Sequence, residues 1–166
     1  GADYGSTIAG GAHNRLLGST CWGFIGGGAC NTGSAPNVVV AGGRLNSAEG
    51  NCSAILGGCF NRACGALSSI VGGELNTNSS CRGFIGGGYN NSGSAYGGVF
   101  IVGGFSNFMC ITGTGGDNLI GAGRCNKICG NNVLDSSIVG GCLNTGSASL
   151  SFIGGGKNNT IAACST

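Results

Sequence analysis

The residues of this chain that could perform chemistry are eleven cysteines, five carboxylates and one histidine. A polysaccharide-cleaving enzyme needs two carboxylates held close together. Asp117 and Asp135 are the only tempting pair, since both lie in the least regular stretch of the sequence, but we interpret each as a turn residue. His13 has no cysteine or acid at a motif spacing, which argues against a catalytic triad. The sequence therefore predicts that the protein is not an enzyme.

The cysteine spacing is also a poor match to a metal site. Cys125 and Cys129 are separated by three residues, which is not the spacing of a zinc knuckle, and His13 is the only histidine. The number of cysteines is odd, so at least one thiol cannot pair within the chain. We interpret most of them as small buried hydrophobic residues and expect neither a metal nor a cofactor.

Composition excludes several classes of protein. Only 7% of the residues are charged, yet 41% are hydrophobic, so the chain is not of the disordered type despite its 39 glycines. The net charge of +2 is too small and dispersed for nucleic-acid binding. No apolar run approaches the roughly 20 residues of a membrane span, so we expect no membrane insertion. The chain starts without Met or a signal peptide, and we expect it to be a fragment of a longer fibre protein.

One motif, apolar-x-Gly-Gly-x-x-Asn, occurs ten times. The only departure from Gly-Gly is Ala122. The copies begin at Ile8, Ile25, Val40, Ile55, Ile70, Ile85, Ile101, Ile120, Ile138 and Ile153. Tandem self-similarity of this kind is typical of repeat architectures, so we treat residues 1–166 as a single repeat domain.

The length and chemistry of the repeat predict one coil of a β-solenoid. A period of about 15 residues is too short for a two-helix unit, and Gly, Asn, Ser and Thr form helices poorly. The residues before each Gly-Gly are β-branched or aromatic, as strands prefer. We expect two short strands and two turns per coil. Gly-Gly supplies a positive φ at one turn, and the motif Asn also tolerates a left-handed backbone. Asn side chains about 4.8 Å apart in successive coils would form amide ladders.

Both faces of the motif strand are apolar. Side chains alternate along a strand, so the residues on either side of the motif Ile share its opposite face. On that opposite face, a large residue on one side of the motif Ile is matched by a small residue on the other side, as a packed surface requires. The pairs are Phe24 with Gly26, Phe84 with Gly86, Phe152 with Gly154, Ser69 with Val71, Ser137 with Val139 and Ala54 with Leu56. The coil with Phe100 and Val102 breaks this rule and is expected to bulge.

A strand that is apolar on both faces needs a cover on its outside. The simplest cover is another copy of the chain, so we predict a parallel homotrimer with this strand near the axis. The alternatives are a wider monomeric coil or a lateral covering domain. The position two residues after the first Gly of each motif, which holds three of the seven basic residues, is expected to be a solvated corner.

The motifs Ser69-Ile70-Val71-Gly72-Gly73 and Ser151-Phe152-Ile153-Gly154-Gly155-Gly156 resemble the repeats of a known family. They are similar to YadA-like heads of trimeric autotransporter adhesins and to related coils of phage tail fibres. This resemblance implies a trimer of β-rolls that binds host surfaces, at the virion surface or at the extracellular face of a cell. The many cysteines favour a phage or viral fibre, because virion proteins assembled in reducing cytoplasm can keep free thiols.

Contacts with a receptor are expected where the coils are irregular, because loops on a rigid scaffold often carry function. The expected contact residues are Trp22, Phe108, Asp117, Asn131 and Asn132. Trp22 could stack on a sugar ring, or it could plug the core at the end of the rod. Cys110 and Cys129 each lie nine residues after their motif Ile in adjacent coils, so in an oxidising site they could form a disulfide.

The sequence thus predicts a structural and receptor-binding fibre segment that mediates attachment to a cell surface, with itself and a surface glycan or protein as partners. The first alternative is a purely structural spacer or filament subunit without a ligand. A polysaccharide-binding or polysaccharide-cleaving tailspike is a further alternative. An ice-binding solenoid would need a regular Thr array, and the chain has a single Thr-x-Thr, formed by Thr112 and Thr114.

Overall fold

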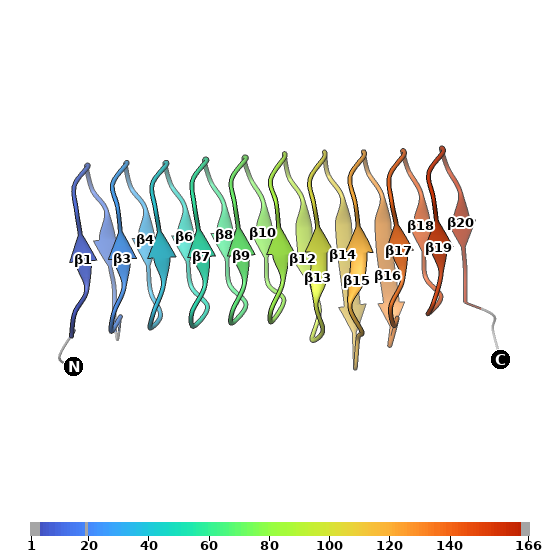
Figure 1. The fold of residues 1–166 in the computed structure, drawn as a ribbon, viewed down its shortest axis with the longest axis horizontal. Helices are drawn as coiled ribbons and strands as arrows, with labels where there is room; N and C mark the ends of the chain where they lie inside the picture. The colour runs from blue at the N-terminus through green and yellow to red at the C-terminus, as the bar shows by residue number, and fades with distance from the viewer. Residues whose placement is uncertain (1–3, 19, 164–166) are drawn as a thin grey trace.

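The computed structural model describes residues 4–18 and 20–163 and shows an all-β solenoid of ten coils. The predicted fold class is therefore confirmed. Each coil supplies one strand to each of two ten-stranded parallel sheets, which lie as two layers along the rod with the termini at opposite ends (Figure 1). No helix long and apolar enough to cross a membrane occurs in these described ranges.

The front sheet in Figure 1 consists of the odd-numbered strands, and the back sheet of the even-numbered ones. The odd strands are β1 (Thr7–Ile8), β3 (Phe24–Ile25), β5 (Val39–Val40), β7 (Ala54–Ile55), β9 (Ser69–Ile70), β11 (Phe84–Ile85), β13 (Val99–Ile101), β15 (Asn118–Ile120), β17 (Ser137–Ile138) and β19 (Phe152–Ile153). The even strands are β2 (Arg15–Leu16), β4 (Thr32–Gly33), β6 (Ser47–Ala48), β8 (Arg62–Ala63), β10 (Thr77–Asn78), β12 (Ser92–Ser94), β14 (Phe108–Thr112), β16 (Lys127–Asn131), β18 (Thr145–Gly146) and β20 (Thr160–Ile161).

The motif residue that opens each copy lines the core between the sheets. Each pairs in register with its equivalent in the next coil, as Ile55 does with Ile70. From Ile25 to Ile138 these side chains are almost completely buried. Small or aliphatic residues from the even strands, such as Ala48, Ala63 and Met109, complete the core. A parallel stack in constant register keeps like side chains together, so one favourable contact is repeated along the rod.

The corner after the motif strand contains two residues with positive φ. The first is the second Gly of the motif, for example Gly58 with φ +84°. The second is the residue before the motif Asn in all ten coils, for example Leu45 and Phe60 with φ 56°. The expectation that the Asn itself is left-handed is wrong, because the Asn must point into the core. The preceding residue takes the left-handed turn and points outward instead.

The motif asparagines form the expected ladder inside this corner. Nδ2 of Asn61 donates to the carbonyl oxygens of Gly57 (3.1 Å) and Gly73 (2.9 Å). Its Oδ1 accepts from the backbone N–H and from Nδ2 of Asn76, at 3.0 and 3.1 Å. One side chain therefore satisfies backbone groups of its own coil and of the next, which a buried polar group must do.

The second corner, which follows each even-numbered strand, holds small residues. Gly50 and Gly65 are buried, and a Cβ on either would lie 2.0 Å from a carbonyl oxygen of the following coil. The corner after the motif Gly-Gly is mostly solvated, as expected, and its residues from Ala12 to Lys157 also form a line of parallel bridges.

The longest coils lie between residues 101 and 138. Strands β14 and β16 have five residues each, and the loop after β14 projects beyond its neighbours (Figure 1). The expected bulge near Phe100 is absent, since Phe100 pairs in register with Phe84 and Leu119. The extra residues are accommodated at the second corner, so the core strands keep their register.

Candidate functional site

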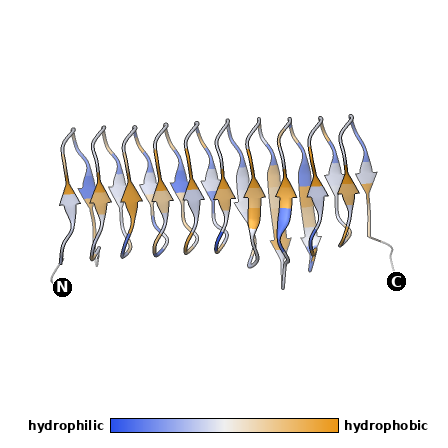
Figure 2. Cartoon of the chain, viewed as in Figure 1, coloured by the Kyte–Doolittle hydropathy of each residue, from blue (hydrophilic) through white to orange (hydrophobic). Residues whose placement is uncertain are grey.

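The outer surface of the odd-numbered sheet is a continuous apolar strip, which we call the apolar face. Figure 2 shows that the odd strands are mostly hydrophobic, whereas the even strands are mostly neutral or hydrophilic. The exposed large side chains of the apolar face are Phe24, Val39, Leu56, Val71, Phe100, Val102, Val139 and Phe152. Soluble proteins rarely expose long contiguous apolar surfaces without a partner, so this strip is a candidate interaction site.

The apolar face is smooth because its large and small residues interlock. A Cβ placed on Gly26 would lie 3.3 Å from Cε1 of Phe24, and one on Gly86 would lie 3.4 Å from Cε1 of Phe84. In these two coils the phenylalanine ring therefore lies along its strand over the glycine two residues later. The alternation of volumes expected from the sequence is confirmed, and it gives a face suited to close packing.

The outer surface of the even-numbered sheet is chemically different and carries a row of small hydroxyl residues. These are Thr32, Ser34, Ser47, Thr77, Ser79, Ser92, Ser94, Thr145, Ser147 and Thr160. Glu49 and Arg62 form a two-point ion pair there, with N–O distances of 2.8 and 2.7 Å. The Arg62 side chain lowers the pKa of the Glu49 carboxyl. This surface can stay in water, so the two outer faces of the rod are unequal.

Trp22 lies at the second corner of the first coil, far along the rod from the other predicted contact residues. Its ring contacts Gly5, where a Cβ would lie 2.3 Å from Cε3 of the indole. The side chain is 65% exposed. The alternative that Trp22 plugs the core at the end of the rod is therefore wrong, and a contact with a ligand remains a prediction.

Phe108, Asp117, Asn131 and Asn132 all belong to the long coils, as expected, and all are exposed. The ring of Phe108 lies 6.0 Å from Nζ of Lys127, close enough for a cation–π contact. Oδ1 of Asn132 accepts hydrogen bonds from N–H and Oγ1 of Thr114, at 2.8 and 3.1 Å. Asn131 ends strand β16, opposite Thr112.

Asp117 and Asp135 lie in adjacent coils and act as turn residues. Oδ1 of Asp117 accepts from the backbone N–H of Gly98, and Oδ1 of Asp135 accepts from that of Asp117, both at 3.1 Å. Each carboxylate thus supports the turn of the preceding coil. Among the described residues, no group of three or more histidine, cysteine or acidic side chains is placed to hold a metal ion.

Cys110 and Cys129 lie opposite each other on β14 and β16, in the register expected from the sequence. Both are free thiols in this structure, and both are partly buried. The interpretation of most cysteines as buried residues is wrong, because every described cysteine is only partly buried or is exposed. Burial raises the pKa of the Cys129 thiol to about 11, and the neighbouring Cys110 contributes to the shift. The juxtaposition is confirmed, and formation of a disulfide stays a prediction.

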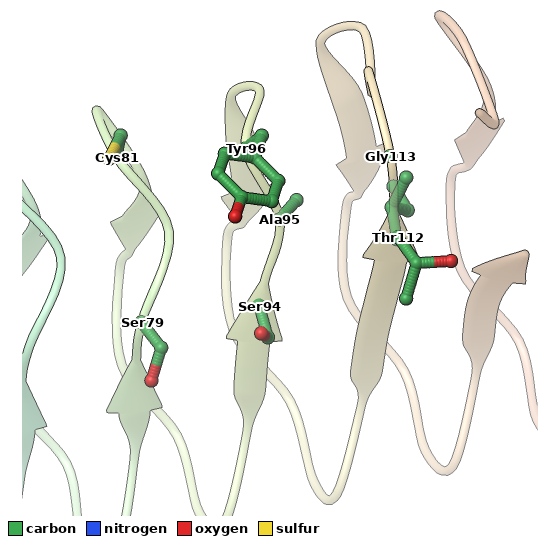
Figure 3. A pocket seen from close by; sticks show the side chains of 8 residues that line it. Ser79, Cys81, Ser94, Ala95, Tyr96, Thr112 and Gly113 are labelled. Carbon is green, nitrogen blue, oxygen red and sulfur yellow. The ribbon is translucent and has the colours of Figure 1, made fainter. Parts of the chain in front are cut away.

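The structure also contains a hollow that the sequence did not indicate. It lies on the even-numbered side at the step between the short coil of β12 and the long coil of β14, beside Tyr96 (Figure 3). The sequence signal for it was the abrupt lengthening of the coil after Tyr96, which could have directed attention to this aromatic residue.

Comparisons with known proteins bring no further identification. No protein-family model matches the chain, and no curated protein is significantly similar to it. The features of the molecule that bear on its function are the two outer faces and the irregular coils.

Proposed function

We propose that this chain is a structural fibre segment that associates in parallel with copies of itself through the apolar face. The observation that carries the proposal is the run of exposed Phe, Val and Leu side chains along the odd-numbered sheet; the even-numbered sheet exposes Phe108 but has no such run. Their burial would be favourable by about 25 cal/mol per Å². The opposite sheet carries hydroxyl groups that remain compatible with water.

The geometry favours rotational symmetry about an axis parallel to the rod. In a cyclic assembly every copy presents the same face to the axis, so equivalent coils of neighbouring copies meet at one height. A trimer of this kind is what the resemblance to adhesin heads and tail-fibre coils implies. We expect the purified protein to have about three times the chain mass of 16.0 kDa in light scattering.

Two leucines provide a matched test of the interface. Leu56 on the apolar face is 55% exposed, and Leu67 at the second corner is 56% exposed. We expect Leu56→Glu to shift the assembly towards monomer, because a carboxylate would be buried against a neighbouring copy. Leu67→Glu should leave the mass unchanged. A monomeric wild-type protein, or equal effects of both substitutions, would contradict the proposal.

Attachment to a cell surface is the role that we assign to the irregular coils of this fibre. The specific observation is that the loop after β14 projects beyond the regular rod (Figure 1) and is built on hydrogen-bonded turns. Binding of the wild-type protein to cells should be lost when residues 113–116 are shortened to a regular turn, while the assembly persists. Unchanged binding would leave the spacer alternative as the better description.

A further inference from the structure

The hollow beside Tyr96 is a consequence of unequal coil lengths. Strand β12 ends at Ser94, whereas β14 in the next coil continues to Thr112. The longer strand therefore stands beyond the shorter one and forms a wall. The resulting depression has a volume of about 410 Å³. That volume falls within the range of small-molecule sites in proteins.

The lining of this depression is neutral and rich in hydroxyl groups. Its residues include Ser79, Cys81, Ser94, Tyr96, Ile111 and Thr112, and none of the lining side chains is charged. Ile111 belongs to the hydrophobic core and is almost fully buried, so it offers little surface to a ligand. Serine and threonine hydroxyls can both donate and accept hydrogen bonds. A ligand that offers several hydroxyl groups and no charge would match this lining.

Tyr96 adds an aromatic platform to the hydroxyl groups. Its side chain is 79% exposed. In Figure 3 it stands at the turn above Ser94, with its hydroxyl end directed towards Ser94 and with Cys81 and Thr112 on the coils to either side. An exposed tyrosine ring offers an apolar face and a polar tip, and such a residue gains from being covered by a ligand. A pyranose ring has the complementary chemistry, with C–H groups on its face and hydroxyls on its rim.

We propose that the hollow beside Tyr96 is a binding subsite for a neutral saccharide, with the tyrosine ring as stacking platform and the Ser79 and Ser94 hydroxyls as polar contacts. The subsite lies on the even-numbered side, away from the apolar face, so it is open in a monomer and in the proposed trimer alike. It does not rest on self-association, and the two proposals can fail separately.

The test is a titration of the wild-type protein with methyl β-D-galactopyranoside, methyl α-D-glucopyranoside and N-acetylglucosamine, followed by saturation-transfer NMR. We expect at least one of them to bind with a Kd on the order of 1–10 mM, because the site is open and the ligand small. Tyr96→Ala should weaken binding about tenfold through loss of the stacking surface. Tyr96→Phe should retain most of the affinity, because the ring remains.

Tyr89→Ala is the matched control, because Tyr89 is also exposed but stacks on Phe105 at the other corner, with ring centroids 5.2 Å apart. It should leave saccharide binding unchanged. Absence of binding by all three sugars up to about 50 mM would overturn the proposal, given the expected affinity. So would an equal loss in Tyr89→Ala and Tyr96→Ala, or a loss in Tyr96→Phe as large as that in Tyr96→Ala. Circular dichroism of each variant would establish that the fold is retained.

Discussion

At the scale of single residues, the motif asparagine does more than a turn residue would. Each buried Asn joins its own Gly-Gly corner to the corner of the next coil through both ends of its amide. The sequence predicted the ladder from the spacing alone. It placed the left-handed conformation on the wrong residue, because periodicity does not reveal which of two neighbouring side chains points inward.

Substitution of a central motif asparagine should therefore be costly. We expect Asn61→Ala to lower the free energy of unfolding by about 2 kcal/mol, because it removes the partner of the buried Asn76 N–H and a hydrogen bond to each of the Gly57 and Gly73 carbonyl oxygens. Asn159→Ala in the last coil, where the side chain is exposed, should cost about 1 kcal/mol or less. Urea unfolding followed by circular dichroism would measure both. Equal losses would show that the ladder contributes little beyond a local turn.

The Cys129 thiol should be slow to react at neutral pH. Its pKa is raised to about 11, chiefly by burial, and the thiolate is the reactive form. The rate of alkylation by iodoacetamide should therefore keep rising up to about pH 11, and at pH 8 it should lag behind that of the exposed Cys52. Peptide mass spectrometry would give the two rates.

The same shift in the pKa of Cys129 affects stability. The folded protein holds the thiol proton of Cys129 more tightly than the unfolded chain does. The resulting contribution to the free energy of unfolding is complete below about pH 9 and is lost as the pH rises towards 11. A labelling rate for Cys129 that levels off below pH 9 would contradict the raised pKa.

At the scale of elements, the two glycines of each motif have different functions. A Cβ on Gly57 would meet no atom within 4 Å. At Gly58 the backbone is left-handed, with φ +84°, and a Cβ would lie 2.1 Å from the carbonyl oxygen of Gly73. The second glycine allows successive coils to approach closely, and the first does not have this function.

We expect Gly58→Ala to destabilise the protein by about 3 kcal/mol or more, through backbone strain and the clash with the next coil. Gly57→Ala should change stability by less than about 1 kcal/mol, because the site has room for a methyl group. Thermal unfolding of the pair under one buffer condition would test this. A similar melting temperature for the two variants would argue against the close approach at Gly58.

At the scale of the whole molecule, the rod is a one-dimensional stack in which each coil contacts mainly its neighbours. Removal of residues 55–69 would join Ala54 to Ile70, and Ile70 would take the register position of Ile55. We expect this deletion to give a folded rod with one coil fewer and a sheet-rich circular dichroism spectrum.

Removal of residues 62–69 provides the control for this deletion. It takes away less of the chain, but it eliminates β8 and the second corner and leaves the coil unable to close. We expect this shorter deletion to abolish cooperative unfolding. A folded product from both deletions would show that register is not what holds the stack together.

The sequence by itself determined the number of coils, the strand positions, the burial of the motif residues and the apolar character of both faces of the motif strand. It could do so because these follow from a short period and from the alternation of side chains along each strand. Only the tertiary structure decided that Trp22 stays exposed, that Asp117 and Asp135 support adjacent turns, and that a hollow lies beside Tyr96. Those features depend on how coils of unequal length lie against one another, and that is a relation between segments which no local pattern records.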